Sequence, residues 1–355
     1  YNFEPQRVMP GDTRDKNGVY HFLLGDEGMV DYNDKVIKEL AKENIEIMKA
    51  WRTKFNEGYT EEQIEQLLRL CDVIDELWIK HTELRKEISK KTKDKLCIYG
   101  HKDDESNGSP LSTKDKDYLY NKHYKSENVE NSGPYARLKL VMDYWCSLWF
   151  WPIEKAELLP TRDEFLFDLS LILEGDIFNI DEEIEQLRLF NNGVNIQVKI
   201  NDITDNLGKV NLDKLCSRIP RLEIVKELSI NHKFLHWELE FTDIFEDKEG
   251  FDLILGNPPW LKLGWEEKGI LGDINPKIMI RNLTAKQTLE IRDSILEEND
   301  KSKMSYIEEY ESISSTQAFI GSITNYKDLI GTQPNLYKCF LPQAWMLSNM
   351  NGISS

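Results

Sequence analysis

The chain has 355 residues, of which 40% are hydrophobic and 30% charged, and its formal net charge is −18. This composition is typical of a soluble globular protein that buries a core, and the length allows two domains. The acidic excess excludes a protein that grips nucleic acid non-specifically over its whole surface, because phosphate binding requires a basic surplus.

Three further features of the sequence bear on its class. The longest nearly apolar run, 138–153, is interrupted by Lys139 and Asp143, so it predicts a buried helix and not a membrane span. The polar, acidic N-terminus does not fit a secretory signal peptide. The five cysteines are scattered without a CxxC or CxxH pair, which argues for reduced thiols in a cytoplasm and against a zinc site. We therefore expect a cytoplasmic protein that uses no metal and no membrane.

Helical spacing of apolar residues begins near the N-terminus. Residues 33–51 predict one helix. Thr60 and Gln63 form a capping-box pattern that begins a second, longer helix, whose apolar stripe continues to Ile88. The two helices together predict an antiparallel helical hairpin. His81 lies on the apolar stripe and is expected to be a core histidine.

A polar connection rich in Lys, Asp and Ser is predicted at 89–118, after the second helix. Pro134 and a capping-box pattern at Thr161 and Glu164 mark the beginnings of two later helices. The predicted helices of this region lie near 114–130, 134–150, 161–174 and 211–231. We therefore expect a mostly helical domain at 1–235.

The pattern changes at residue 236. Segment 236–245 is predicted to be a strand that runs into a turn, and 250–256 a second, buried strand of aliphatic residues. Helices return at 284–299 and near 334–348. Continuous apolar strands followed by helices indicate a parallel sheet covered by helices. The expected fold class is therefore α-rich α/β.

The most informative segment is Asn257–Pro258–Pro259–Trp260, which follows directly on the strand predicted at 250–256. Ligands bind at the carboxyl ends of strands in open α/β sheets. The two prolines stiffen the backbone, so the Asn257 side-chain oxygen and a neighbouring carbonyl can be held as adjacent acceptors. Such a pair suits a planar amino group and activates its nitrogen, while Trp260 offers a face on which a base stacks. An ordinary strand-to-loop turn is the alternative interpretation.

Three segments carry a resemblance to a known family. LILGNPPW (253–260) resembles motif IV of amino-methyltransferases that use S-adenosylmethionine, in particular the N6-adenine DNA methyltransferases of restriction–modification systems. FTDIF (241–245) resembles motif III, and NLYKCFLPQAWML (335–347) resembles the helix of motif V, with NGISS beginning the next strand. The motif order resembles that of the γ group. The resemblance implies a helical insertion domain at 1–235, followed at 236–355 by part of a Rossmann-like class I methyltransferase domain.

The resemblance also implies an activity and roles for the residues. The activity would be site-specific, adenine-specific DNA methylation in a restriction–modification or phage-defence system. S-adenosylmethionine would be the cofactor, with Asp243 contacting its adenine and Ile244 beside it. Double-stranded DNA would be the partner, with the target adenine flipped out of the duplex. Asn257 and the Pro258 carbonyl would orient and activate N6, Pro259 would fix the loop, and Trp260 would stack on the base.

One motif of the family is not found. Motif I is a glycine loop of the F-x-G-x-G type, and no two glycines of this chain are separated by a single residue. The nearest segment, FLLGDEG (22–28), has the wrong spacing and is expected to be an ordinary turn. We therefore expect motifs I and II to lie upstream of Tyr1 in a longer protein. This fragment alone is expected to bind the cofactor weakly or not at all and to be inactive, and DNA would be bound by the full-length protein.

Two other functions stay open. A methyltransferase that acts on RNA or on a protein glutamine would use a similar loop, because such loops serve planar amides as well as bases. A non-catalytic helical interaction module is the other alternative, and the acidic charge agrees with it. Loss of methylation on replacing Asn257, with folding retained, distinguishes either enzyme from the interaction module.

Overall fold

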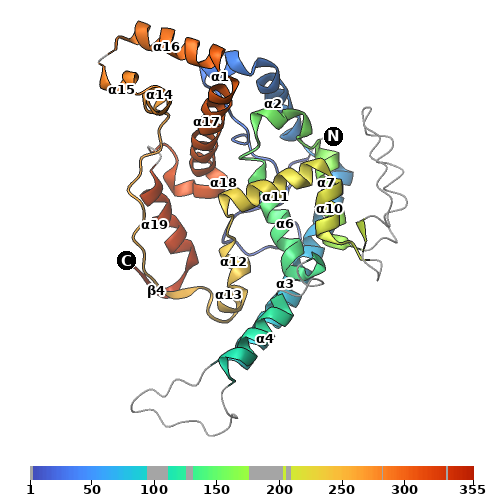
Figure 1. Ribbon diagram of the computed structural model, residues 1–355. Helices are drawn as coiled ribbons and strands as arrows, with labels where there is room; N and C mark the ends of the chain where they lie inside the picture. Colours follow the sequence, from blue (N-terminus) through green and yellow to red (C-terminus); the bar gives the residue numbers. More distant parts are fainter. Residues whose placement is uncertain are drawn as a thin grey trace.

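The protein is described by a computed structural model that covers residues 3–93, 111–124, 131–175, 203–204, 209–281, 283–332 and 335–355. Helices dominate these residues, and each of the two sheets found among them has two parallel strands (Figure 1). The α-rich α/β class expected from the sequence is therefore confirmed. The domain boundary at 235/236 stays a prediction, and hydrogen bonds cross it, such as that between His81 and the Leu239 carbonyl.

The N-terminal part of the chain corrects the prediction of one helix at 33–51. Its elements are β1 (Gln6–Val8), β2 (Gly18–Tyr20), η1 (His21–Leu23), α1 (Lys35–Leu40) and α2 (Lys42–Phe55). Ala41, with φ −132° and ψ 43°, leaves the helical conformation and separates α1 from α2. Asp34 caps α1, because its side chain accepts from Val36 N at 2.8 Å and Ile37 N at 3.1 Å.

The longest helix is α3 (Glu61–Thr92), and it begins at the predicted capping box. Gln63 N donates to Thr60 Oγ1 and Thr60 N donates to Gln63 Oε1, both at 3.2 Å. His81 is buried on α3 and donates through Nε2 to the Leu239 carbonyl at 3.0 Å, and burial lowers its pKa. The prediction of a core histidine is confirmed. The predicted hairpin of α2 with α3 is not found, because α2 packs mainly against η2 (Ile153–Leu158) and α3 against α6 (Pro134–Ser147) and α7 (Arg162–Glu174).

The remaining helices of this region agree in part with the prediction. They are α4 (Thr113–Tyr124), α6, α7, α10 (Leu212–Arg218) and α11 (Pro220–His232). The helix predicted at 211–231 is two helices, because Pro220 lacks the N–H that would continue α10 and instead begins α11. Residues 125–130 of one predicted helix and 94–110 of the predicted connection lie outside the described residues.

An ion pair lies inside the core of the helical part. Asp168 on α7 is fully buried, and Arg221 on α11 holds its two oxygens through Nε at 2.5 Å and Nη2 at 2.8 Å. Tyr144, also buried, donates its hydroxyl to Asp168 Oδ2 at 2.9 Å. A carboxylate taken out of water requires such partners, so these three side chains fix how α6, α7 and α11 pack together.

The C-terminal part corrects the prediction of a strand at 236–245. That segment forms two short helices, α12 (Trp237–Glu240) and α13 (Thr242–Lys248). The aromatic side chains in it recur at helical spacing: Trp237 stacks on Phe241 with ring centroids 5.7 Å apart, and both Phe241 and Phe245 contact Phe251. Packing of these rings against the next element therefore favours the helical period over the alternating one.

The elements that follow confirm most of the prediction. They are β3 (Phe251–Ile254), α14 (Glu267–Ile274), α15 (Lys277–Ile280), α16 (Ala285–Glu298), α17 (Asp300–Gly321), α18 (Ile323–Tyr326), η4 (Lys327–Leu329), α19 (Leu336–Leu347) and β4 (Ser348–Ser354). The strand expected from NGISS is β4, and it pairs in parallel with β3. The strand predicted at 250–256 is present but not buried, since Leu253 is 55% exposed and Leu255 beyond its end is 71% exposed.

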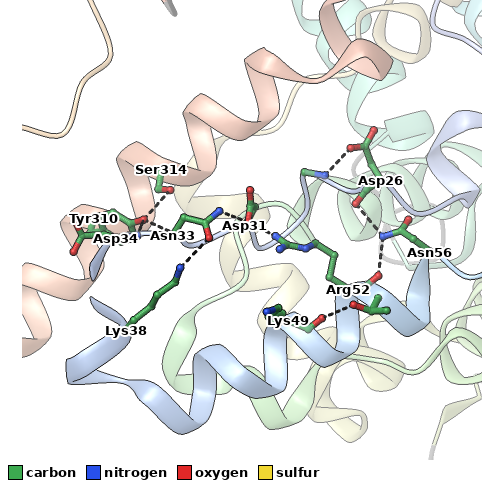
Figure 2. Close-up of polar contacts among 12 residues, drawn as sticks. Asp26, Asp31, Asn33, Asp34, Lys38, Lys49, Arg52, Asn56, Tyr310 and Ser314 are labelled. Carbon is green, nitrogen blue, oxygen red and sulfur yellow. Dashed lines mark hydrogen bonds and ion pairs between the residues drawn. The ribbon is translucent and has the colours of Figure 1, made fainter. Parts of the chain in front are cut away.

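Figure 2 shows how the segment before α1 is joined to α2 and α17. Tyr310 Oη on α17 accepts from Asn33 N at 3.1 Å and Asp34 N at 2.9 Å, and Asn56 Nδ2 donates to the Asp26 carbonyl at 3.3 Å. The segment 22–28 ends in the expected turn, and a Cβ on Gly25 would meet Asn56 Oδ1 at 2.5 Å. Gly25 is therefore required for packing against α2.

Candidate functional site

The strand β3 delivers the Asn257–Trp260 loop to its position. Gly250, directly before the strand, has φ 141°, a conformation that L side chains rarely adopt. A Cβ at Gly250 would lie 2.6 Å from the Leu347 carbonyl oxygen at the end of α19. Glycine at this position therefore allows β3 and the α19–β4 connection to approach each other closely enough to pair.

Both flanks of the loop are held by backbone hydrogen bonds. On the strand side, Gly256 N donates to the Ser355 carbonyl at 3.1 Å. On the far side, Leu336 N at the beginning of α19 donates to the Leu261 carbonyl at 3.0 Å, and Lys262 forms a bridge with Asn335. The four residues between these anchors, Asn257 to Trp260, therefore span a short distance between the end of β3 and the N-terminus of α19.

The side chains of the loop face solvent. Asn257 is exposed and forms no hydrogen bond with another described residue, so its amide oxygen is available as an acceptor. Pro258 is half-buried and Pro259 is exposed. The Trp260 side chain is 81% exposed. The loop thus exposes an amide and a large aromatic ring within four residues of the sequence.

One face of Trp260 is covered by Tyr337, on the first turn of α19. The two ring centroids lie 5.0 Å apart and the ring planes are inclined by 19°, a stacked pair. Tyr337 therefore supports the indole from one side and leaves its other face open. Sequence reasoning placed Tyr337 in the motif V helix but gave it no role, because nothing local links it to the loop.

Asp243, the residue predicted to contact the cofactor, lies on α13, before β3. Its Oδ1 accepts from Arg85 Nε of α3 at 2.8 Å, and the Arg85 guanidinium also lies over the Phe241 ring at 5.7 Å. Ile244 beside it is half-buried. Asp243 therefore precedes β3 in the sequence, and Asn257 follows it. Arg85 was not identified from the sequence.

Three more contacts from α3 fix α12 and α13. Trp78 Nε1 donates to Thr242 Oγ1 at 3.1 Å, and Thr82 Oγ1 lies 2.6 Å from the same oxygen. His81 bonds the Leu239 carbonyl, as described above. Two turns of one long helix therefore determine where Asp243 lies.

Metal and membrane chemistry receive no support from the described residues. None of their His, Cys, Asp and Glu side chains gather in groups of three or more that would hold a metal ion. In the same ranges, no helix is both long and apolar enough to cross a membrane.

Comparison with known proteins gives one match. A family model described as Eco57I restriction-modification methylase matches residues 76–268, more than half of the chain. The match includes Arg85, Asp243 and the Asn257–Trp260 loop, and it ends before Tyr337. No curated protein and no solved structure matches the chain.

Proposed function

Because the chain belongs to the Eco57I restriction-modification methylase family, we propose that it is part of a DNA methyltransferase that methylates N6 of adenine, with S-adenosylmethionine as the methyl donor. The observation that carries the proposal is that Asn257 and Trp260, just after the carboxyl end of β3, are both exposed, and that Asn257 has no partner among the described residues. These two side chains would bind an amino group on a flat ring.

The described residues fit the half of the site that receives the base. The Asn257 oxygen and the Pro258 carbonyl would accept the two N6–H bonds of a flipped adenine, which draws the nitrogen lone pair out of the ring. Trp260, backed by Tyr337, would stack on the base with its open face. A linear glutamine amide would gain less from a ring of this size, so the geometry favours a base.

The fit to the other half rests on Asp243. Its carboxylate is held by Arg85, which fixes an acceptor in place for the amino group of the cofactor's adenine, with Ile244 beside it. S-adenosylmethionine supplies the methyl group when it is bound. The exposed side chains of Leu253 on β3 and of Leu255 just after it are what a parallel sheet covered on both faces would bury, so we propose that β3 and β4 belong to a larger, Rossmann-like sheet.

The test is methyl transfer from labelled S-adenosylmethionine to duplex DNA by the full-length protein. Asn257→Ala should lower the rate by about 10²–10³-fold, as expected for loss of one preorganised group at a developing charge. Asn17→Ala, in an exposed turn near the N-terminus and distant in sequence from the loop, is the matched control. Equal rates for the two variants would overturn the proposal. If the label appears in RNA or in protein and not in DNA, the substrate is different from the one proposed, but the role of the loop stays the same.

A further inference from the structure

A cavity of about 370 Å³ lies between the helical part and the last helices of the chain. The residues that line it lie on η1, α6 and the α11–α12 segment, and on α17, α18 and α19. The volume lies at the lower end of the range of small-molecule sites. Aromatic rings make up much of the wall: His21, Trp145, Phe234, Trp237, Phe319 and Tyr326.

Part of the aromatic wall, formed by His21 and Trp145, is held in place and uncharged. His21 meets the Trp145 ring edge-on at 5.3 Å, and Trp145 Nε1 is held by the Leu24 carbonyl at 2.8 Å. Burial lowers the pKa of His21 to about 4, so its ring is neutral at pH 7. Fixed, neutral rings of this kind favour a flat heteroaromatic ligand, because stacking requires little loss of side-chain entropy.

Two polar side chains in the same wall have no partner among the described residues. The Glu238 carboxyl forms no hydrogen bond or ion pair with any of them, and burial raises its pKa. The Gln343 amide on α19 likewise forms no hydrogen bond within the described ranges. A half-buried carboxyl without a partner carries a free-energy cost that a ligand N–H would relieve. The wall thus offers an acceptor at Glu238 and both a donor and an acceptor at Gln343.

The cavity is separate from the Asn257–Trp260 loop. Gln343, Met346 and Leu347, which line it, lie in the last two turns of α19, whereas Tyr337 under Trp260 lies in the first turn. The helix has 12 residues and is therefore about 18 Å long. Trp237 in the cavity wall contacts Phe251 at the beginning of β3, and the loop follows the end of β3. The cavity and the Asn257–Trp260 loop therefore lie at opposite ends of α19 and of β3.

We propose that this cavity is a second binding site, which takes a flat heteroaromatic ring carrying an exocyclic amino group, as in an aminopurine nucleoside. The amino group would donate to Glu238, and the Gln343 amide would bond a ring nitrogen. The aminopurine would be a free nucleoside, because the proposed function assigns the adenine of S-adenosylmethionine to Asp243, which does not line this cavity.

The test is calorimetric titration of the full-length protein with adenosine and with inosine, in which the amino group is replaced by an oxo group. Adenosine should bind at least about tenfold more tightly than inosine, since a hydrogen bond to a charged group is lost. Glu238→Gln should weaken adenosine binding by a similar factor, with Glu246→Gln, an exposed neighbour on α13, as the matched control. The titrations are repeated on an Asn257→Ala background, which removes the acceptor proposed for a target adenine, so the heat that remains reports the cavity and does not depend on the outcome of the methylation assay.

A competition titration tests whether the cavity is distinct from the cofactor site. Adenosine binding to protein saturated with S-adenosylmethionine supports a separate nucleoside site. Displacement of adenosine by S-adenosylmethionine, with both weakened by Glu238→Gln, overturns the proposal, because the cavity would then hold the cofactor. No heat with adenosine at millimolar concentration, or a Glu238→Gln variant that unfolds at the wild-type temperature and still binds adenosine as tightly as the wild type does, overturns it.

Discussion

The indole of Trp260 and the phenol ring of Tyr337 stack with centroids 5.0 Å apart, although the helices from α14 to η4 lie between the two residues in the sequence. The pair joins the loop after β3 to the first turn of α19. It gives an exposed tryptophan a defined orientation, which a lone surface ring lacks.

Replacing Trp260 tests the stacking role directly. Trp260→Ala should reduce kcat/KM for DNA methylation by about 5–150-fold, because base–aromatic stacking contributes about 1–3 kcal/mol. Trp260→Phe should retain most of the activity. Unchanged kcat/KM in the alanine variant would show that the ring does not contact the substrate.

Tyr337 should act through Trp260. Tyr337→Ala removes one aromatic pair, worth about 0.5–1.5 kcal/mol, so methylation should fall by about 2–10-fold. Tyr337→Phe keeps the stack and should behave as wild type. In the double variant with Trp260→Ala, the Tyr337 effect should vanish, and full additivity would contradict a positioning role.

The Arg85–Asp243 pair should determine cofactor affinity. Arg85→Ala leaves a partly buried carboxylate without its charged donor, a loss of about 1.5–3 kcal/mol. We expect KM for S-adenosylmethionine to rise by about 10–150-fold while KM for DNA stays the same. Arg85→Lys restores the charge but not the geometry, and partial rescue is the expected result. An unchanged KM for the cofactor would separate Asp243 from the cofactor site.

The buried pair of Asp168 and Arg221 should dominate the stability of the helical part. Asp168→Ala removes the carboxylate that pairs with the buried guanidinium of Arg221, so the free energy of unfolding should fall by about 3–5 kcal/mol. Asp213→Ala breaks the exposed pair with Lys226 and should cost less than about 1 kcal/mol. Urea unfolding curves of the two variants provide the comparison, and similar midpoints would contradict it.

Glu311 should make stability depend on pH. Burial raises the pKa of its carboxyl to about 7 from 4.5, with Glu154 and Glu308 adding to the rise and the hydrogen bond from Ile153 N opposing it. Between these pH values the folded protein keeps a proton that the unfolded chain loses, so the free energy of unfolding falls as pH rises through this window.

Glu311→Gln should remove that dependence and stabilise the protein above pH 7, by about 3 kcal/mol as an order of magnitude. The measurement is the difference in urea unfolding free energy between wild type and variant at pH 5 and pH 8. Glu309→Gln, at an exposed position of the same helix, serves as control. A difference that does not change with pH would show that Glu311 titrates normally.

Local hydrogen-bond patterns allowed much of the fold to be predicted. The capping boxes at Thr60, Thr161 and Thr284 each begin a helix, because the bonds that define them lie within three residues. The strand at 236–245 was wrong because a short apolar and acidic alternation fits either period. The helical period is favoured by contacts of Trp237 with Phe241 and with Phe251. Phe251 belongs to the next element, so the segment's own sequence does not reveal this contact.

In the candidate site, too, only the residues with a local sequence signal could be predicted. Asn257 and Trp260 are visible in the sequence because the two prolines between them are a local signal. Arg85 and Tyr337 are not, since Arg85 lies 158 residues before its partner Asp243 and Tyr337 belongs to a separate helix. Only packing of α3 on α13, and of the loop on α19, brings these side chains together.

The pairing of β3 with β4 has a consequence during synthesis. Phe251 pairs with Ser348, so the first strand leaves the ribosome well before its partner exists. At about 5–20 residues per second, roughly 5–20 s pass before the roughly hundred intervening residues are made. For that time the edge of β3, with Leu253 and Leu255 beside it, is an unpaired template for other chains. Slower translation across α14–α19 should therefore lower the yield of folded protein, and chaperone binding should concentrate on nascent chains of this length.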